Sequence, residues 1–245
     1  GENGPEVQRD WELPRAANAA GGIISTPADQ LRYACFHMGD GTAADGTRLL
    51  SPESLALMQT ATAPAGNGIA ALGIAWMLRD VGGARVVQHG GATNGQMSAF
   101  QMVPARRFAI TVLTNADKGG ELHRNVANWA LKHYLGIEES TPTVREISAE
   151  ALGEFVGRYA SLGNDLELSL NDGGLEGRLI PKGGFPTKDT PPPPAPPPFV
   201  VGFVDRGNLL VTEGPFKDMA VDVLRGSDDR VTYLRVGYRI MKRDQ

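Results

Sequence analysis

The chain has 245 residues, of which 24 are basic and 28 are acidic, so its formal net charge is −4. This balance argues against a nucleic-acid-binding protein, because such proteins normally carry a basic stripe. The single cysteine, Cys35, excludes an intramolecular disulfide and a cysteine-rich metal site. No apolar run approaches the roughly 20 residues that a membrane span needs, so we expect no membrane span.

Residues 1–138 show a mixed pattern of helices and strands. Thr26 can cap a helix that begins at Pro27, because threonine side chains accept backbone hydrogen bonds and proline lacks the N–H that would stay unpaired there. A packed face is predicted at helical spacing in this helix; it contains Leu31, Ala34, Cys35 and Met38. Ser51 starts a second, shorter helix.

Four strands are then predicted over residues 72–79, 85–89, 97–103 and 108–114. The last of them is apolar on both faces, as expected for a central strand. An amphipathic helix over residues 120–135 should cover this sheet. Its packed face is predicted to contain Leu122, Val126, Trp129 and Ala130, and Trp76 is also expected in the core.

Residues 150–245 read as short strands separated by turns, after a linker over residues 139–149. Ser148 can cap a short helix that reaches Tyr159. Seven or so strands in under 100 residues indicate a small barrel or sandwich. A proline-rich loop over residues 181–198 interrupts them. The sequence therefore predicts an α+β fold: an antiparallel sheet with covering helices, followed by a small all-β domain.

The most informative segment runs from Val86 to Ser98. A strand enters a polar, glycine-rich bend, and a second strand leaves it. Gly90 and Gly95 have the spacing of glycines in a phosphate-binding loop. However, Gln96 stands where such a loop needs lysine, and no helix follows, so the segment does not favour a nucleotide cofactor.

Two interpretations of the bend remain. It can be an active-site edge strand, where glycines let a substrate approach the backbone and an N–H stabilises an oxyanion. His89 would then add a proton donor or a positive charge. Alternatively, it is a structural turn with a satisfied histidine, which spacing alone favours. No metal site is predicted at His37, His123 or His133, since no pair of them joins a carboxylate at ligand spacing.

Three segments together resemble the serine β-lactamase/penicillin-binding-protein-like family, in its class C and D-aminopeptidase or esterase branch. They are Ala17–Thr26, the helix with Phe36–Gly41, and His89–Gly95. The resemblance covers roughly residues 10–136. It implies the C-terminal portion of a β-lactamase/transpeptidase-like fold, and the region after residue 150 resembles a lipocalin-like C-terminal barrel.

The resemblance also implies a site. His89-Gly90-Gly91 matches the family's third motif, with His89 in the electrostatic catalytic position. Ala92 would supply the oxyanion N–H, and Gly90, Gly91 and Asn94 would complete the substrate-binding wall. The implied activity is acyl-enzyme hydrolysis of small amides or esters, such as D-amino peptides, esters or β-lactam-like compounds. The family chemistry needs no cofactor.

The family's other two motifs have no match in this chain. None of the nine serines has lysine three residues on, and none of the five tyrosines has asparagine two residues on. Ser169-Leu170-Asn171 fits a Ser-x-Asn pattern formally but lies in the all-β region. We therefore expect the nucleophile and base in a missing N-terminal portion or partner chain, which would also complete the open edge of the sheet.

Two functional hypotheses follow. In the first, the chain is part of a serine hydrolase and is inactive alone, because it lacks nucleophile and base. In the second, it is a non-catalytic ligand-binding or regulatory module, whose carrier is the C-terminal barrel.

Overall fold

The computed structural model describes residues 4, 7, 13, 15–66, 69–93, 95–116, 119–140, 142–171, 174–184, 187–237 and 239–244. The chain divides into two compact units. The first contains Gly1–Ala65 and Ile69–Ser140, and the second contains Gly66–Gly68 and Thr141–Gln245. Among the described residues, no helix is both long and apolar enough to cross a lipid bilayer.

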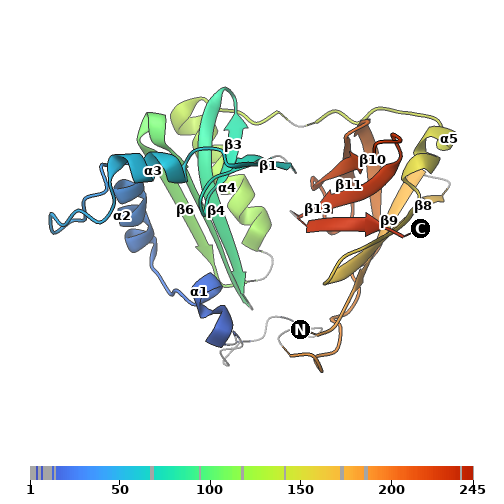
Figure 1. Cartoon of the computed structure of the whole chain (residues 1–245), viewed down its shortest axis with the longest axis horizontal. Helices are drawn as coiled ribbons and strands as arrows, with labels where there is room; N and C mark the ends of the chain where they lie inside the picture. The colour runs from blue at the N-terminus through green and yellow to red at the C-terminus, as the bar shows by residue number, and fades with distance from the viewer. Residues whose placement is uncertain are drawn as a thin grey trace. The chain divides into compact units, whose positions relative to one another are not determined.

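The first unit is built on a six-stranded sheet whose strands follow one another in chain order (Figure 1). They are β1 (Ala63–Gly66), β2 (Ile69–Leu72), β3 (Met77–Val81), β4 (Ala84–Thr93), β5 (Gln96–Val103) and β6 (Phe108–Thr114). Neighbours from β2 to β6 pair antiparallel. Short connections produce this meander, because only antiparallel strands can be joined by tight turns.

Helices cover both faces of this sheet. α2 (Pro27–His37) packs on one face and α4 (Gly119–Leu135) on the other, and the remaining helices of this unit are η1 (Arg15–Ala17), α1 (Asn18–Gly21), α3 (Pro52–Met58) and η2 (Pro104–Arg106). Successive strand residues point to opposite faces, so Val87 packs in one cluster with Ala34 of α2, and Val86 packs in another with Leu131 of α4. The α2 face and the α4 face therefore have separate cores.

The expected helix starts are confirmed. The Asp29 N–H donates to Thr26 Oγ1 at 3.2 Å, and the Ser54 N–H donates to Ser51 Oγ at 3.1 Å. In both helices a proline occupies the first helical position. Local hydrogen bonding and the fixed φ of proline are sufficient to set these two boundaries.

Two predictions about the strands are wrong. The single strand over residues 72–79 is a hairpin of β2 and β3, because Ala75 takes a left-handed φ of 62° and the Gly73 N–H donates to the Trp76 carbonyl at 2.9 Å. The strand over residues 108–114 is β6, which lies at the edge of the sheet and not at its centre. Its apolar character has another origin, since both α2 and α4 pack against it.

The packed faces of two helices also differ from prediction. In α4, Leu122 and Trp129 are 52% and 56% exposed. Ala130 is buried as predicted, and the rest of the buried face consists of His123, Ala127 and Leu131. The small alanines let α4 lie close to the sheet. In α2, Ala34 is buried as predicted, whereas Leu31 and Cys35 are exposed, because the helix buries Ala34 together with His37.

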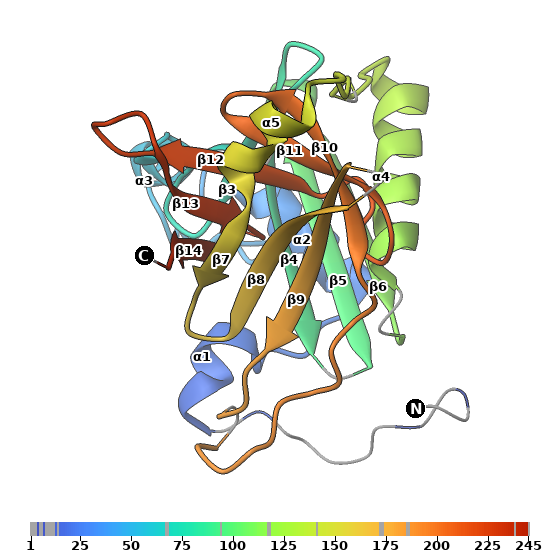
Figure 2. The same ribbon diagram turned by 90° about the vertical axis from the view of Figure 1, so that its right-hand side faces the viewer.

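The second unit is a closed eight-stranded barrel, in the order β10-β11-β12-β13-β14-β7-β8-β9. Its elements are α5 (Ala149–Leu152), η3 (Gly153–Phe155), β7 (Gly157–Ala160), β8 (Asn164–Asn171), β9 (Gly174–Pro181), β10 (Phe199–Asp205), β11 (Asn208–Glu213), β12 (Ala220–Arg225), β13 (Val231–Val236) and β14 (Arg239–Arg243). Figure 2 shows β7, β8 and β9 side by side in the barrel wall. The predicted α+β fold class is confirmed, and the all-β part is a barrel and not a sandwich.

Side chains alternate in direction along each barrel strand, so the inward-pointing apolar ones form one continuous cluster inside the barrel. Phe155, Tyr159 and Leu234 in this cluster have no exposed surface. Ser148 caps α5 as expected, since its hydroxyl accepts the Ala151 N–H at 3.2 Å. The helix predicted to reach Tyr159 is shorter, because Tyr159 already belongs to β7. Its hydroxyl donates to the Phe155 carbonyl at 2.8 Å, which satisfies the buried polar atom.

Candidate active site

Strand β4 extends beyond its neighbour β3. The two strands pair from Val81 and Ala84 as far as Met77 and Gln88. From His89 to Thr93, β4 pairs only with β5 among the described residues. This half of β4 is therefore a local edge inside the sheet, with one side open.

The register shows which backbone groups face that open side. Val81 and Ala84 close a hairpin whose two turn residues are glycines, and Thr93 and Gln96 close the next hairpin. In two-residue hairpins the closing pair is hydrogen-bonded, and the direction of bonding alternates along the strand. Odd-numbered residues of β4 therefore bond to β5. Gly90 and Ala92 direct their N–H and C=O groups to the side where β3 has ended.

The predicted glycine-rich bend is much shorter than expected. Gly90, Gly91 and Ala92 continue the strand, and the chain reverses only after Thr93. Gly95, with a φ of 70°, lies in this reversal. Asn94, the remaining candidate residue, lies outside the described residues.

The His89 side chain is on the α2 face of the sheet, opposite Phe100. It is exposed, and its imidazole forms no hydrogen bond or ion pair with any described residue. The neighbouring glycine allows close cross-strand packing, because a Cβ on Gly91 would lie 2.9 Å from Ser98 Oγ. This part of β4 therefore exposes the His89 imidazole together with backbone that carries no large side chain at Gly90, Gly91 and Ala92.

A cleft of about 330 Å³ lies against this part of β4. Four of the predicted site residues, His89, Gly90, Gly91 and Ala92, line it together. The facing wall comes from α1 and the segment that leads to α2, with residues Ala19, Ala20, Gly21, Ile23, Ile24 and Ser25. Two of the three segments singled out in the sequence therefore meet at one cleft.

The side chains that line the cleft carry little charge. His89 is the one titratable side chain among the lining residues that the structure describes, and no lysine or carboxylate accompanies it. Ser25 and Ser98 both reach the cleft, but neither has an amine beside it that could act as a base. The cleft therefore contains groups suited to bind and polarise a substrate, without an activated nucleophile.

A second hollow, of about 310 Å³, reaches the same strands from the α4 face. His123 lines it and shares a hydrogen bond of 3.0 Å with Thr114 Oγ1. Burial lowers the pKa of His123, so its imidazole is neutral near pH 7 and supplies no positive charge. No sequence pattern indicates this contact, because it depends on how α4 packs on β6.

The described part of the chain contains no group of three histidine, cysteine or acidic side chains that could hold a metal ion. Arg79 and Arg124 line the second hollow, and Arg79 forms an ion pair with Glu139. The cleft therefore offers hydrogen bonding from backbone groups, from one imidazole and from uncharged side chains such as Ser25, Gln30 and Ser98.

Known proteins resemble both units. Residues 1–134 match the Beta-lactamase family. Penicillin-binding protein 4 of Amycolatopsis lactamdurans is 38% identical over 138 residues, which are 54% of this chain and 36% of that protein. An uncharacterised protein of Mycobacterium tuberculosis is 53% identical over 47 residues, 19% of this chain and 12% of that protein.

Among solved structures, the crystal structure of SurE with D-Leu superimposes with a TM-score of 0.63 at 17% identity. The match covers 89% of this chain and 50% of that chain, and it shows likeness of fold. The chain thus spans about a third of the length of the penicillin-binding protein and half of the SurE chain. Because the family match covers more than half of its residues, the chain belongs to the Beta-lactamase family, whose fold is of the serine-hydrolase type.

Proposed function

We propose that the chain forms one wall of the acyl-transfer site of a serine hydrolase. The observation that carries this proposal is the exposed half of β4, where His89, Gly90, Gly91 and Ala92 line one cleft. Backbone donors at an unpaired strand edge are suited to stabilise a negative charge, because they are fixed in direction before the substrate arrives.

In the proposed reaction, a serine outside this chain attacks the carbonyl carbon of the substrate. A lysine of the same Ser-x-x-Lys motif accepts the serine proton. The carbonyl oxygen becomes an oxyanion and accepts a hydrogen bond from the Ala92 N–H, while His89 lies beside it and supplies a proton donor or positive charge. Collapse of the intermediate expels the amine or alcohol with a proton. Water then hydrolyses the acyl-enzyme and regenerates the serine.

The lining residues favour small neutral or anionic amides and esters as substrates. No carboxylate on the described wall would repel an anionic substrate, and the facing wall is built from small and aliphatic residues. D-Amino peptides, esters and β-lactam-like compounds share such an acyl group. The D-leucine named with SurE agrees with the first of these classes.

The proposed docking surface for the nucleophile-bearing segment consists of the outer edge of β6 and the exposed side chains of α4. β6 pairs only with β5 among the described residues, so its outer edge can accept another strand. Leu122 and Trp129 form an exposed stripe along α4, the helix that packs on β6. We propose that the segment bearing the Ser-x-x-Lys motif, whether in the same protein or in a partner chain, pairs with β6 and covers this stripe.

Activity tests the proposal. The chain alone should not hydrolyse nitrocefin or p-nitrophenyl acetate, whereas a protein that adds the Ser-x-x-Lys segment should. In that protein, Ala92→Pro removes the proposed donor, and kcat should fall about 10²–10³-fold. The fold should survive, since this N–H faces the open edge and proline is tolerated where no ladder bond is lost.

Ala92→Ser keeps the N–H and is the matched control. Full activity in Ala92→Pro would refute the oxyanion role of Ala92. Loss of hydrolysis in His89→Ala with unchanged KM would support the role of His89 in the reaction itself. Turnover by the isolated chain would overturn the division of the site between two segments.

Docking is tested by association of the chain with the separately produced Ser-x-x-Lys segment. The double variant Leu122→Gln/Trp129→Gln should weaken the complex at least about tenfold in analytical ultracentrifugation. Both changes place amides on apolar surface that the docked segment would bury. Lys132→Gln, a change on an exposed residue of the same helix, should leave association unchanged. Equal affinity of both variants would exclude the α4 stripe as the docking surface.

A further inference from the structure

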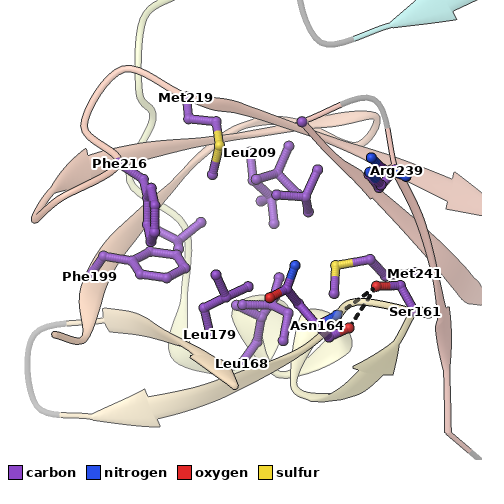
Figure 3. A pocket seen from close by; sticks show the side chains of 15 residues that line it. Ser161, Asn164, Leu168, Leu179, Phe199, Leu209, Phe216, Met219, Arg239 and Met241 are labelled. Atoms are coloured by element: carbon purple, nitrogen blue, oxygen red, sulfur yellow. Dashed lines mark hydrogen bonds between the residues drawn. The ribbon is translucent and has the colours of Figure 1, made fainter. Parts of the chain in front are cut away.

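The barrel of the second unit encloses a cavity of about 230 Å³ (Figure 3). Its walls are apolar side chains from most of the strands, among them Leu168, Leu179, Phe199, Leu209, Phe216 and Met241. Phe199 and Phe216 meet edge to face, with ring centroids 5.4 Å apart. The interior is thus not completely filled by its own side chains.

One end of the barrel is closed. Phe155 of η3 has no exposed surface and contacts Phe203 of β10 with ring centroids 6.0 Å apart. At this end Arg225 donates two hydrogen bonds of 2.9 Å to Glu154, just before Phe155. Aromatic packing and a bidentate ion pair therefore seal the barrel below the cavity.

The opposite end supplies the rim of the cavity. The connections β7–β8, β9–β10, β11–β12 and β13–β14 all lie there, because alternate turns of an antiparallel barrel share one end. They contribute Ser161, Phe216 and Gly237 to the lining. A ligand would enter between these turns.

Two polar side chains at the cavity have no partner among the residues that the structure describes. The Asn164 carboxamide points toward the cavity in Figure 3, and no described residue hydrogen-bonds to it. Arg239 is exposed at the same rim and has no ion pair with a described carboxylate. In contrast, Lys182, which bonds to the Ser161 carbonyl at 2.8 Å, is paired with Asp165 at 2.5 Å.

The volume limits the size of the ligand. An apolar cavity of about 150 Å³ holds benzene, which has six non-hydrogen atoms. In proportion, the cavity of about 230 Å³ accepts about nine such atoms. The apolar wall selects a hydrocarbon body, while a guanidinium at the rim selects a carboxylate.

We infer that the barrel binds a small monocarboxylic acid with a compact apolar body, such as an aliphatic acid of about eight carbons. The hydrocarbon lies between Phe199, Phe216 and Leu209. The carboxylate lies at the rim, where Arg239 and the Asn164 amide donate to it. This site lies wholly within the second unit and does not depend on the acyl-transfer proposal.

The test is titration of the whole chain with sodium octanoate, followed by calorimetry and by NMR. We expect saturable binding with a submillimolar Kd. Intermolecular nuclear Overhauser effects should join octanoate methylenes to the rings of Phe199 and Phe216. 1-Octanol should bind more weakly, because it lacks the charge that Arg239 recognises.

Arg239→Gln should weaken octanoate about tenfold and leave 1-octanol unchanged, since it removes only the charge-assisted contact. Arg230→Gln is the matched control: Arg230 lies in the β12–β13 turn at the closed end and should not affect binding. Leu209→Phe should fill the cavity and abolish binding of both compounds.

No saturable binding at millimolar octanoate would overturn the inference. Equal weakening by Arg239→Gln and Arg230→Gln would overturn the role of the rim. If Leu209→Phe does not fold, the Overhauser contacts in the native chain decide: contacts outside the cavity lining would refute the site.

Discussion

Every strand of the barrel has two hydrogen-bonded neighbours, whereas the sheet of the first unit ends at β6 with only one among the described residues. The hydrophobic cores of the two units also differ in how continuous they are. The barrel has one continuous cluster of buried side chains, and the first unit has two smaller clusters on opposite faces of its sheet. A closed barrel satisfies its backbone and its apolar surface without help from another segment.

Some of the exposed apolar side chains of the first unit lie at the cleft or on α4. Ile23 and Ile24, which line the cleft, are 86% and 83% exposed. Tyr33 of α2 and Trp129 of α4 are also exposed. Contiguous exposed apolar surface usually marks interaction sites. The barrel thus satisfies its own strand edges, whereas β6 keeps an open edge among the described residues, where we propose that another segment docks.

A matched pair of aromatic truncations gives the largest expected contrast. Phe155→Ala should lower the free energy of unfolding of the barrel by about 3–5 kcal/mol, because it leaves a cavity in a fully packed region. Trp129→Ala should change the stability of the first unit by less than about 0.5 kcal/mol, since the side chain is largely exposed.

Urea unfolding can follow the two units separately. The chain's tryptophans all precede residue 130, so their fluorescence reports the first unit, while near-ultraviolet circular dichroism of tyrosines includes the barrel. Phe155→Ala should move the barrel transition and leave the tryptophan transition in place. A large loss of stability in Trp129→Ala would show that the α4 stripe is already packed within this chain.

The sequence is sufficient to locate most elements, because caps and periodicity act locally. Thr26, Ser51 and Ser148 all cap helices as predicted. The buried face of α4 could not be predicted in this way. Hydrophobicity identifies the stripe with Leu122 and Trp129, but it does not say which segment covers that stripe. The sheet itself is packed by small residues such as Ala127 and Ala130.

The candidate site was only partly predictable. The motif around His89 identifies the strand, but the direction of the Ala92 N–H follows from the register of two hairpins and from the point where β3 ends. The resemblance to a lipocalin-like barrel raised the hypothesis of a ligand-binding barrel, but the residue pattern does not show whether the interior holds a cavity. Alternation shows which side chains point inward, whereas the space left between them depends on how opposite walls meet. Asn164 and Arg239 look like ordinary turn-flanking residues in the sequence.

The smallest expected contrast concerns pH. His37 is 3% exposed and packs against Tyr33 and Trp76, with ring centroids 4.3 and 5.1 Å away. Its Nδ1 is buried without a hydrogen-bond partner among the described residues. Burial lowers the pKa of His37 from its usual 6.5, because the aromatic surroundings disfavour the charged imidazolium.

Because the pKa of His37 is lower in the folded state than in the unfolded state, acid destabilises the first unit. Below pH 6.5 the unfolded state binds the proton more readily than the folded state, so the stability of the first unit should fall as the pH decreases through that value. The stability is fully present above pH 6.5. His123, whose pKa is also lowered by burial, acts in the same direction.

Tryptophan-detected unfolding between pH 7.5 and 5 should therefore show a decline that His37→Phe reduces, with His123 responsible for part of the remainder. All four histidines precede residue 134, so the barrel transition is an internal control without any histidine. An unchanged decline in His37→Phe would mean that the buried imidazole is protonated without cost. A similar decline in the barrel would show that carboxylates, and not histidines, set the acid sensitivity of both units.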